Sequence, residues 1–410
     1  MNNFDPGSSI QDHLVFGEFG DVNPSITDSA TYTFLSPETM KQSFEHEIEG
    51  CFLYSRHWNP INKYLSEALS RMEDSESAIV TSSGMAAISC AILQICNTGD
   101  EIISSRTIYG GTYAFLKNYL PKFGIKVQFV NITDLNAVTK AISEKTKIIY
   151  CETISNPLLE IADILMLSSL AKKNNIKLVV DNTFSPMIIS PLRLGADVVV
   201  HSMTKFINGS NDCVAGCICS DKEFINSLTD INAGSSMLLG PVLDSFRAAS
   251  ILKNIHTLHI RIKQHSKNAL YIAQNLEAMG FKVYYPGLPS HRQHNLIKEI
   301  MNPGFGFGGM LAFDVYTLEN ANKLMTMMQQ EKVGLLAVSL GYFKTLFSSP
   351  GNSTSSEIPE DERNEMGLSS GLVRFSVGLD NDIERTFERI KKCLSDCGLL
   401  IKEKSSTDIA

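Results

Sequence analysis

Short apolar runs alternate with stretches of helical periodicity through the first half of the chain. The runs are rich in Val and Ile and are bounded by polar residues, which is typical of strands buried on both faces of a parallel sheet. They lie at residues 78–81, 101–105, 127–130, 147–152, 177–181 and 198–202. The segments between them, such as 61–72 and 164–173, have the 3.6-residue period of amphipathic helices. This alternation predicts an α/β domain with a parallel-rich, doubly wound sheet.

The pattern changes after about residue 250. Residues 251–269 keep a helical period and predict one long helix that links two domains. Beyond it, apolar strand patterns at 281–287, 308–315, 335–341 and 372–379 mix with helical patterns at 318–330 and 382–394. We therefore expect an N-terminal arm (1–57), a first domain (58–257), a smaller C-terminal α+β domain (258–397) and a tail (398–410).

Composition narrows the class of protein. The 410 residues are 43% hydrophobic, as in ordinary globular proteins, and the net charge of −8 argues against a nucleic-acid partner. The start of the chain lacks a signal-peptide pattern, and no apolar stretch is long enough to span a membrane, so we expect a cytoplasmic protein. The nine cysteines have no zinc spacing, and we expect reduced thiols and no metal site.

Candidate chemistry is concentrated at residues 177–206. Asp181 ends one apolar run, Ser202 ends the next, and Thr204 and Lys205 follow directly. In parallel sheets ligands bind beyond the carboxyl ends of the strands, so these side chains should share one rim. An acid, hydroxyls and a lysine suit pyridoxal phosphate (PLP), which forms a Schiff base with lysine and pairs its ring nitrogen with an acid. From spacing alone, Lys205 could equally begin a loop and Asp181 cap a turn.

A resemblance favours the cofactor. The sequences D-N-T-F (181–184), L-G-A-D (194–197), H-S (201–202) and T-K-F (204–206) resemble the lysine motif of the Cys/Met-metabolism PLP-dependent enzymes, the cystathionine γ-synthase-like family. The resemblance covers about residues 15–397. It implies the aspartate-aminotransferase-like fold (fold type I), with a seven-stranded sheet in the PLP-binding domain and a smaller C-terminal domain.

The resemblance also implies roles for residues outside the central stretch. Ser83, Gly84 and Met85 match the turn that binds the cofactor phosphate, although alone they read as an ordinary helix N-cap. Tyr109 matches the ring that stacks on PLP and protonates the leaving group, and Asn156 matches a residue near the cofactor's 3′-oxygen. In relatives the residue at Glu152 helps to order the site, a weaker expectation here.

Two further pairs complete the expected site. Tyr54 and Arg56 lie in Y-S-R-x-x-N-P, which in relatives binds the cofactor phosphate of a neighbouring subunit. Arg374 lies in an apolar strand, where an unpaired charge is costly, so it needs either a structural acid or a ligand. The family implies the substrate α-carboxylate as that ligand, with Ser339 beside it and the lysine.

Within the family, stretches such as TSSGMAAIS (81–89) and SLGYFKTL (339–346) resemble methionine γ-lyases of the plant type and their bacterial relatives. This implies a carbon–sulfur lyase that acts on a small amino acid, and a homotetramer built as a dimer of dimers. Cystathionine γ-lyase, cystathionine γ-synthase and O-acetylhomoserine sulfhydrylase share the same residues, and a non-catalytic PLP-binding scaffold is a different class of alternative. Lys344, if it faced the pocket, would repel a cationic substrate and favour a neutral one.

Overall fold

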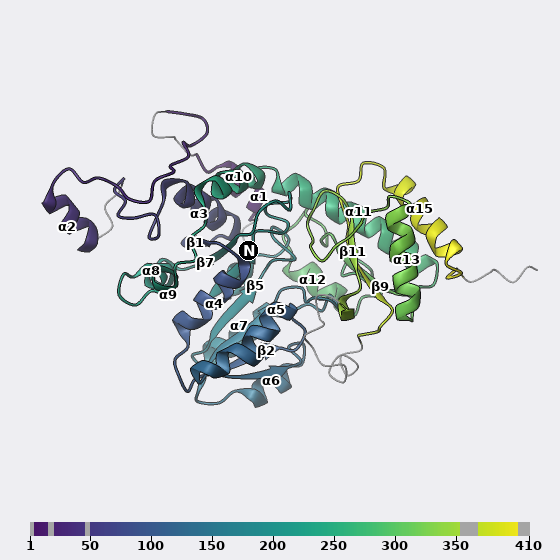
Figure 1. Ribbon diagram of the computed structural model, residues 1–410. Coiled ribbons are helices and arrows are strands. Elements are labelled where there is room, and N and C mark those ends of the chain that lie inside the picture. Colours follow the sequence, from purple (N-terminus) through teal and green to yellow (C-terminus); the bar gives the residue numbers. More distant parts are fainter. Residues whose placement is uncertain (1–3, 15–19, 46–49, 353–367, 401–410) are drawn as a thin grey trace, which may run out of the picture.

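The computed structural model describes residues 4–14, 20–45, 50–352 and 368–400, so residues 401–410 of the predicted tail lie outside it. Two sheets organise these residues (Figure 1). The first has the strand order β1-β7-β6-β5-β4-β2-β3, and only β7 runs against its neighbours. Its strands are β1 (Ser77–Thr81), β2 (Glu101–Ser105), β3 (Lys126–Val130), β4 (Thr146–Glu152), β5 (Lys177–Asp181), β6 (Val198–Ser202) and β7 (Gly216–Ser220).

Helices cover both faces of the first sheet because successive strand residues point to opposite sides. Val180 joins the apolar cluster under α3, α7 and α10, whereas Val179 joins the cluster under α4 and α8. The helices of this part are α1 (Pro6–Gln11), α2 (Pro37–Glu45), α3 (Pro60–Glu73), α4 (Gly84–Ile95), α5 (Gly110–Ala114), α6 (Leu135–Ala141), α7 (Ile164–Lys173), α8 (Lys222–Thr229), α9 (Ser235–Leu239) and α10 (Ser245–Ile255). The predicted parallel-rich, seven-stranded sheet is confirmed.

The second sheet has the order β10-β11-β12-β9-β8 and packs against α11, α13 and α15 on its own apolar core (Figure 1). Its strands are β8 (Lys282–Tyr284), β9 (Met310–Asp314), β10 (Leu335–Leu336), β11 (Leu346–Ser348) and β12 (Leu372–Ser376). Its helices are α11 (Leu258–Ala278), α12 (His294–Ile300), α13 (Leu318–Gln330) and α15 (Ile383–Asp396). The domain boundaries at 57, 257 and 397 remain predictions.

Two predicted elements were wrong. The linking helix is two helices, α10 and α11, interrupted at His256 and Thr257. The Thr257 hydroxyl donates to the carbonyl of Asn254 (3.1 Å), and such local bonds compete with helical ones. The strand predicted at 335–341 is extended only at Leu335–Leu336, because the chain then turns and reaches Gly341 with a φ of +77°.

Three further features bear on function. Within the described ranges, every helix is too short or too polar to cross a membrane. All nine cysteines are free thiols. Among the same residues, no three His, Cys, Asp or Glu side chains are grouped so that they could hold a metal ion.

Candidate active site

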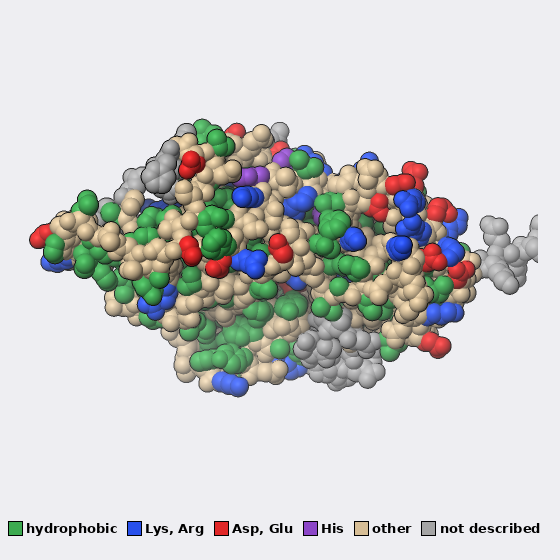
Figure 2. Space-filling model, turned by 45° about the horizontal axis from the view of Figure 1, so that its top comes forward, with side chains coloured by type: hydrophobic (Ala, Val, Ile, Leu, Met, Phe, Trp, Pro, Cys, Tyr) green, Lys and Arg blue, Asp and Glu red, His purple; other side chains and the backbone are tan. Residues whose placement is uncertain are grey.

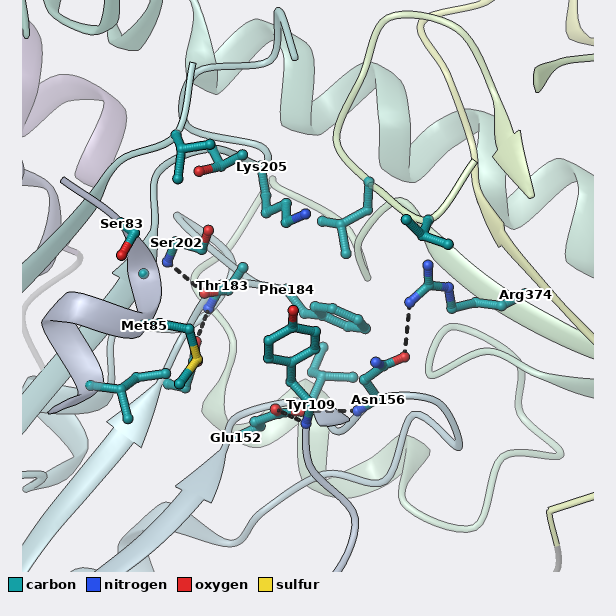
Figure 3. A pocket seen from close by; sticks show the side chains of 18 residues that line it. Ser83, Met85, Tyr109, Glu152, Asn156, Thr183, Phe184, Ser202, Lys205 and Arg374 are labelled. Carbon is teal, nitrogen blue, oxygen red and sulfur yellow. Dashed lines mark hydrogen bonds between the residues drawn. The ribbon is translucent and has the colours of Figure 1, made fainter. Parts of the chain in front are cut away.

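A cavity of about 250 Å³ lies beyond the carboxyl ends of the strands of the first sheet, and β12 of the second sheet closes its far side (Figure 3). Sequence reasoning placed ten residues here that do line it: Ser83, Gly84, Met85, Tyr109, Asn156, Asp181, Ser202, Thr204, Lys205 and Arg374. The segments that follow the strands of the first sheet meet at one rim, as the strand-end rule predicts, and Arg374 reaches the same cavity from the second sheet.

Lys205 follows β6 in a tight turn, and its amine points into the cavity (Figure 3). The Lys205 Nζ donates to Ser339 Oγ (3.2 Å), which in turn donates to Asn211 Oδ1 (2.8 Å). Burial, and next the positive charge of Arg374, lower the pKa of Lys205 to about 8. The amine is therefore neutral, and so nucleophilic, at a much lower pH than an exposed lysine.

Asp181 ends β5 with its carboxylate in the cavity wall, where it is 8% exposed. It accepts from the Thr183 backbone N–H (2.9 Å) and from the Tyr150 hydroxyl (3.4 Å). Burial raises its pKa, and the Thr183 contacts oppose that shift. A buried carboxylate with so few donors is stabilised by a cationic partner, and a protonated pyridine nitrogen is such a partner.

The start of α4 lines the cavity with Ser83, Gly84 and Met85 and forms a cradle of backbone amides. Ser83 caps this helix, accepting from the backbone N–H of Ala86 (3.0 Å), and the first amides of the helix have no acceptor within it. Gly84 lies so close to β6 that a Cβ there would come within 2.7 Å of the Ser202 Cβ. Glycine at 84 therefore lets the start of α4 lie directly against β6, with its first backbone amides beside the cavity, where an anion can bind them.

Glu152 holds two loops of the site at once. Its Oε1 accepts from the backbone N–H of Tyr109 (2.6 Å), and its Oε2 accepts from that of Asn156 (2.9 Å). Burial, and then the nearby carboxylate of Asp181, raise the pKa of Glu152 to about 8. Through these two bonds Glu152 fixes the segments that present the Tyr109 ring and the Asn156 amide (Figure 3).

Arg374 reaches the cavity from β12 and is 2% exposed. Its Nη1 donates to Asn156 Oδ1 (3.0 Å), and its Nε has no hydrogen-bond partner among the described residues. The sequence allowed two partners for Arg374, a structural acid or a ligand. Among the described residues, no Asp or Glu forms an ion pair with it. A buried guanidinium with an unused donor that borders a cavity fits a carboxylate ligand.

Sequence reasoning missed part of the wall. Thr183 accepts from the backbone N–H of Ser202 (2.8 Å) and joins β5 to β6, and it was already part of the quoted D-N-T-F motif. Phe184, the last residue of the same motif, was also missed. The other missed side chains are apolar, and nothing in their sequence context separates them from core residues. They are Ile88, Ile154, Val214, Val338 and Leu340.

Three expected residues lie elsewhere. Tyr54 is 46% exposed, and Arg56 borders a separate small pocket beside Pro241, so this chain does not bring either to its own cavity. Lys344 is exposed and lies over the ring of Phe343, 5.7 Å from its centroid. Because Lys344 does not line the cavity, it gives no support to a neutral substrate.

The residues present fit PLP: an amine, a buried carboxylate and an anion cradle face one cavity. A crystal structure from Campylobacter jejuni that contains N′-pyridoxyl-lysine-5′-monophosphate has the same fold, with a TM-score of 0.88 and 28% identity over 96% of this chain and 100% of that one. Fold and site together define a PLP-dependent enzyme of fold type I.

The sequence comparisons give the family. The model described as "Cys/Met metabolism PLP-dependent enzyme" matches residues 10–393, and the chain belongs to that family. It is 43% identical to methionine gamma-lyase of Arabidopsis thaliana, over 95% of this chain and 90% of the relative. It is 34% identical to cystathionine gamma-lyase of Dictyostelium discoideum, over 97% and 99% of the two chains.

Proposed function

We propose that this protein is a methionine γ-lyase. It cleaves the Cγ–S bond of L-methionine and, with one water, gives methanethiol, 2-oxobutanoate and ammonia. The observation that carries this proposal is the 43% identity to the Arabidopsis methionine gamma-lyase over nearly the whole chain. The cavity wall agrees with it, because Ile154, Val214 and Val338 offer apolar surface to a neutral thioether.

The position of each residue in the cavity indicates its role in the reaction. When bound, PLP draws negative charge away from the substrate α-carbon. Lys205, whose amine faces the cavity and has a pKa lowered to about 8, moves protons at Cα and Cβ of the substrate. Arg374 binds the α-carboxylate through its unused donors, and Ser339 orients the lysine. The phenol of Tyr109 donates a proton to the sulfur as the carbon–sulfur bond breaks.

Ser83, Gly84, Met85, Ser202 and Thr204 surround the phosphate in this proposal, and Asp181 pairs with the ring nitrogen. Asn156, which also lines the cavity, would lie near the 3′-oxygen of the bound cofactor. Each of these side chains lines the cavity, and the cradle at Gly84 is the feature most specific for an anion.

The assembly is a homodimer at least, paired into a tetramer. Tyr54 and Arg56 are away from the cavity of their own chain, which supports their use by a neighbouring subunit. Apolar side chains are exposed on the arm and on α9 and α10, and Figure 2 shows hydrophobic side chains over the left and lower middle of the molecule, whereas charged ones are densest at the right end. They include Leu14, Val22, Leu35, Phe44, Leu238, Leu239 and Phe246. Free thiols throughout support a cytoplasmic location.

A substrate panel tests the function. Purified holoenzyme is given methionine, cystathionine and O-acetylhomoserine in separate reactions, and 2-oxobutanoate and free thiol are measured. The proposal requires the largest kcat/KM with methionine. A larger kcat/KM with cystathionine favours the cystathionine enzymes, and bound PLP without turnover of any amino acid favours the scaffold.

A further inference from the structure

Helix α11 contacts, from outside the cavity, the turn formed by residues 203–209, which we call the lysine turn. The guanidinium of Arg261, on the first turns of this helix, donates to three backbone carbonyls: those of Phe206, Ile207 (2.8 Å) and Asn254 (2.9 Å). Phe206 and Ile207 directly follow Lys205. A planar guanidinium can hold several carbonyls in fixed directions, which a lysine amine on a flexible stem cannot.

The lysine turn is shaped to admit this guanidinium. The backbone N–H of Gly209 donates to the carbonyl of Lys205 (2.8 Å), and the N–H of Asn208 donates to that of Met203 (2.9 Å). Gly209 has a φ of +72°, and a Cβ there would collide with the Arg261 guanidinium. Glycine at 209 therefore serves both the backbone conformation and the approach of Arg261.

The same face of α11 also contacts the residue that directly follows β12, the strand that carries Arg374. His265 lies one turn after Arg261, so the two side chains share a face. The His265 Nδ1–H donates to the carbonyl of Val377 (2.6 Å), just beyond the end of β12, and the His265 ring lies edge-on to Phe206 with centroids 5.2 Å apart. His265 is fully buried.

We infer that the Arg261–His265 face of α11 is a positioning element that sets the place of the Lys205 amine relative to Arg374. Neither side chain lines the cavity, so both act through the backbone of the residues they hold. The amine must reach two substrate carbons while the carboxylate is held at Arg374, and small misplacements of a reacting group are costly to kcat.

The test compares Arg261→Lys with Arg385→Lys, a control on the exposed side of α15. Lysine keeps the charge but cannot hold all of the carbonyls. We expect hydrogen–deuterium exchange of the holoenzyme to be about tenfold or more faster at the amides of Asn208 and Gly209 in Arg261→Lys only. We also expect kcat for methionine to fall by about tenfold or more while KM changes by less than about threefold, because the Arg374 contact persists.

A second variant approaches the same contact from the other side. Gly209→Ala displaces the guanidinium without altering Arg261 and also strains the backbone at a φ of +72°, so exchange should be at least as fast and kcat at least as low as in Arg261→Lys. Wild-type exchange rates at the lysine turn in Arg261→Lys would overturn the inference, and so would fast exchange with unchanged kcat. The kinetic part rests on the proposed lyase activity, whereas the exchange part does not, so a wrong substrate would leave the exchange result intact.

Discussion

At the scale of single residues, the site contains ionisable side chains whose pKa values are shifted by burial. Lys205 loses much of its basicity through burial and the nearby Arg374, whereas Glu152 and Asp181 become weaker acids through burial. Perturbations of this kind cluster at functional sites, and here they border one cavity.

The capture of PLP by the apoprotein should depend on the pKa of Lys205. The neutral amine is the reactive form, so the rate of covalent incorporation should rise with pH and level off above about 8. Arg374→Gln removes a positive neighbour, raises the pKa of Lys205 and moves this rise to higher pH. Absorbance of the bound cofactor after rapid mixing gives the rates. An identical pH midpoint in the two proteins would contradict the assigned influence of Arg374.

Replacing Glu152 by Gln should release one of the two loops it holds, because the amide nitrogen cannot accept from a backbone N–H. We expect kcat/KM for methionine to fall by about tenfold or more. Glu101→Gln is the matched control, since Glu101 accepts from Ser143 Oγ (2.7 Å) at the opposite, amino-terminal end of β2. Equal kcat/KM in both variants would rule out this role of Glu152.

At the scale of elements, a buried ion pair ties α3 to the sheet behind the site. Glu73, the last residue of α3, lies 2.7 Å from His201 of β6, and both are at most 1% exposed. Glu73 also accepts from Asn182, the neighbour of Asp181 (3.0 Å). Although burial opposes protonation, the bond and charge of Glu73 prevail and raise the pKa of His201 to about 9.

This pair predicts a loss of stability at alkaline pH. Between the ordinary His pKa near 6.5 and about 9, the folded protein binds a proton that the unfolded chain does not. The stabilisation is therefore complete below pH 6.5 and is lost as the pH rises through 9, by roughly 3 kcal/mol. His201→Gln should be less stable at pH 6.5 and should lack this decline. Urea unfolding across the range measures both, and parallel curves for the two proteins would contradict the assignment.

How far the sequence predicts these elements depends on how local the determining contacts are. The strands that end at Asp181 and Ser202 were predictable because each is a buried apolar run between polar residues. The pair of Glu73 and His201 was not, because 128 residues separate its members and nothing near either residue indicates its partner. The irregular segment after Leu336 was mistaken for a strand because it contains Val338 and Leu340. These apolar side chains line the cavity and do not belong to a sheet.

At the scale of the whole molecule, the proposed active site needs two chains. If Tyr54 and Arg56 serve a neighbouring subunit, a Lys205→Ala chain and an Arg56→Ala chain are each inactive alone but have complementary defects. Mixing them under conditions that exchange subunits should restore up to about a quarter of wild-type activity, since about half of the dimers are mixed and each has one intact site. Size-exclusion chromatography with light scattering confirms the assembly. No recovery in a mixture shown to contain mixed dimers would contradict the shared site.

The central claim is that Lys205 holds PLP in this cavity, and one measurement tests it directly. The purified holoenzyme is reduced with borohydride and digested, and the peptides are mapped by mass spectrometry. The account predicts a phosphopyridoxyl group on Lys205 and none in Lys205→Ala. A modified lysine elsewhere, or PLP that is bound but never attached to Lys205, would contradict it.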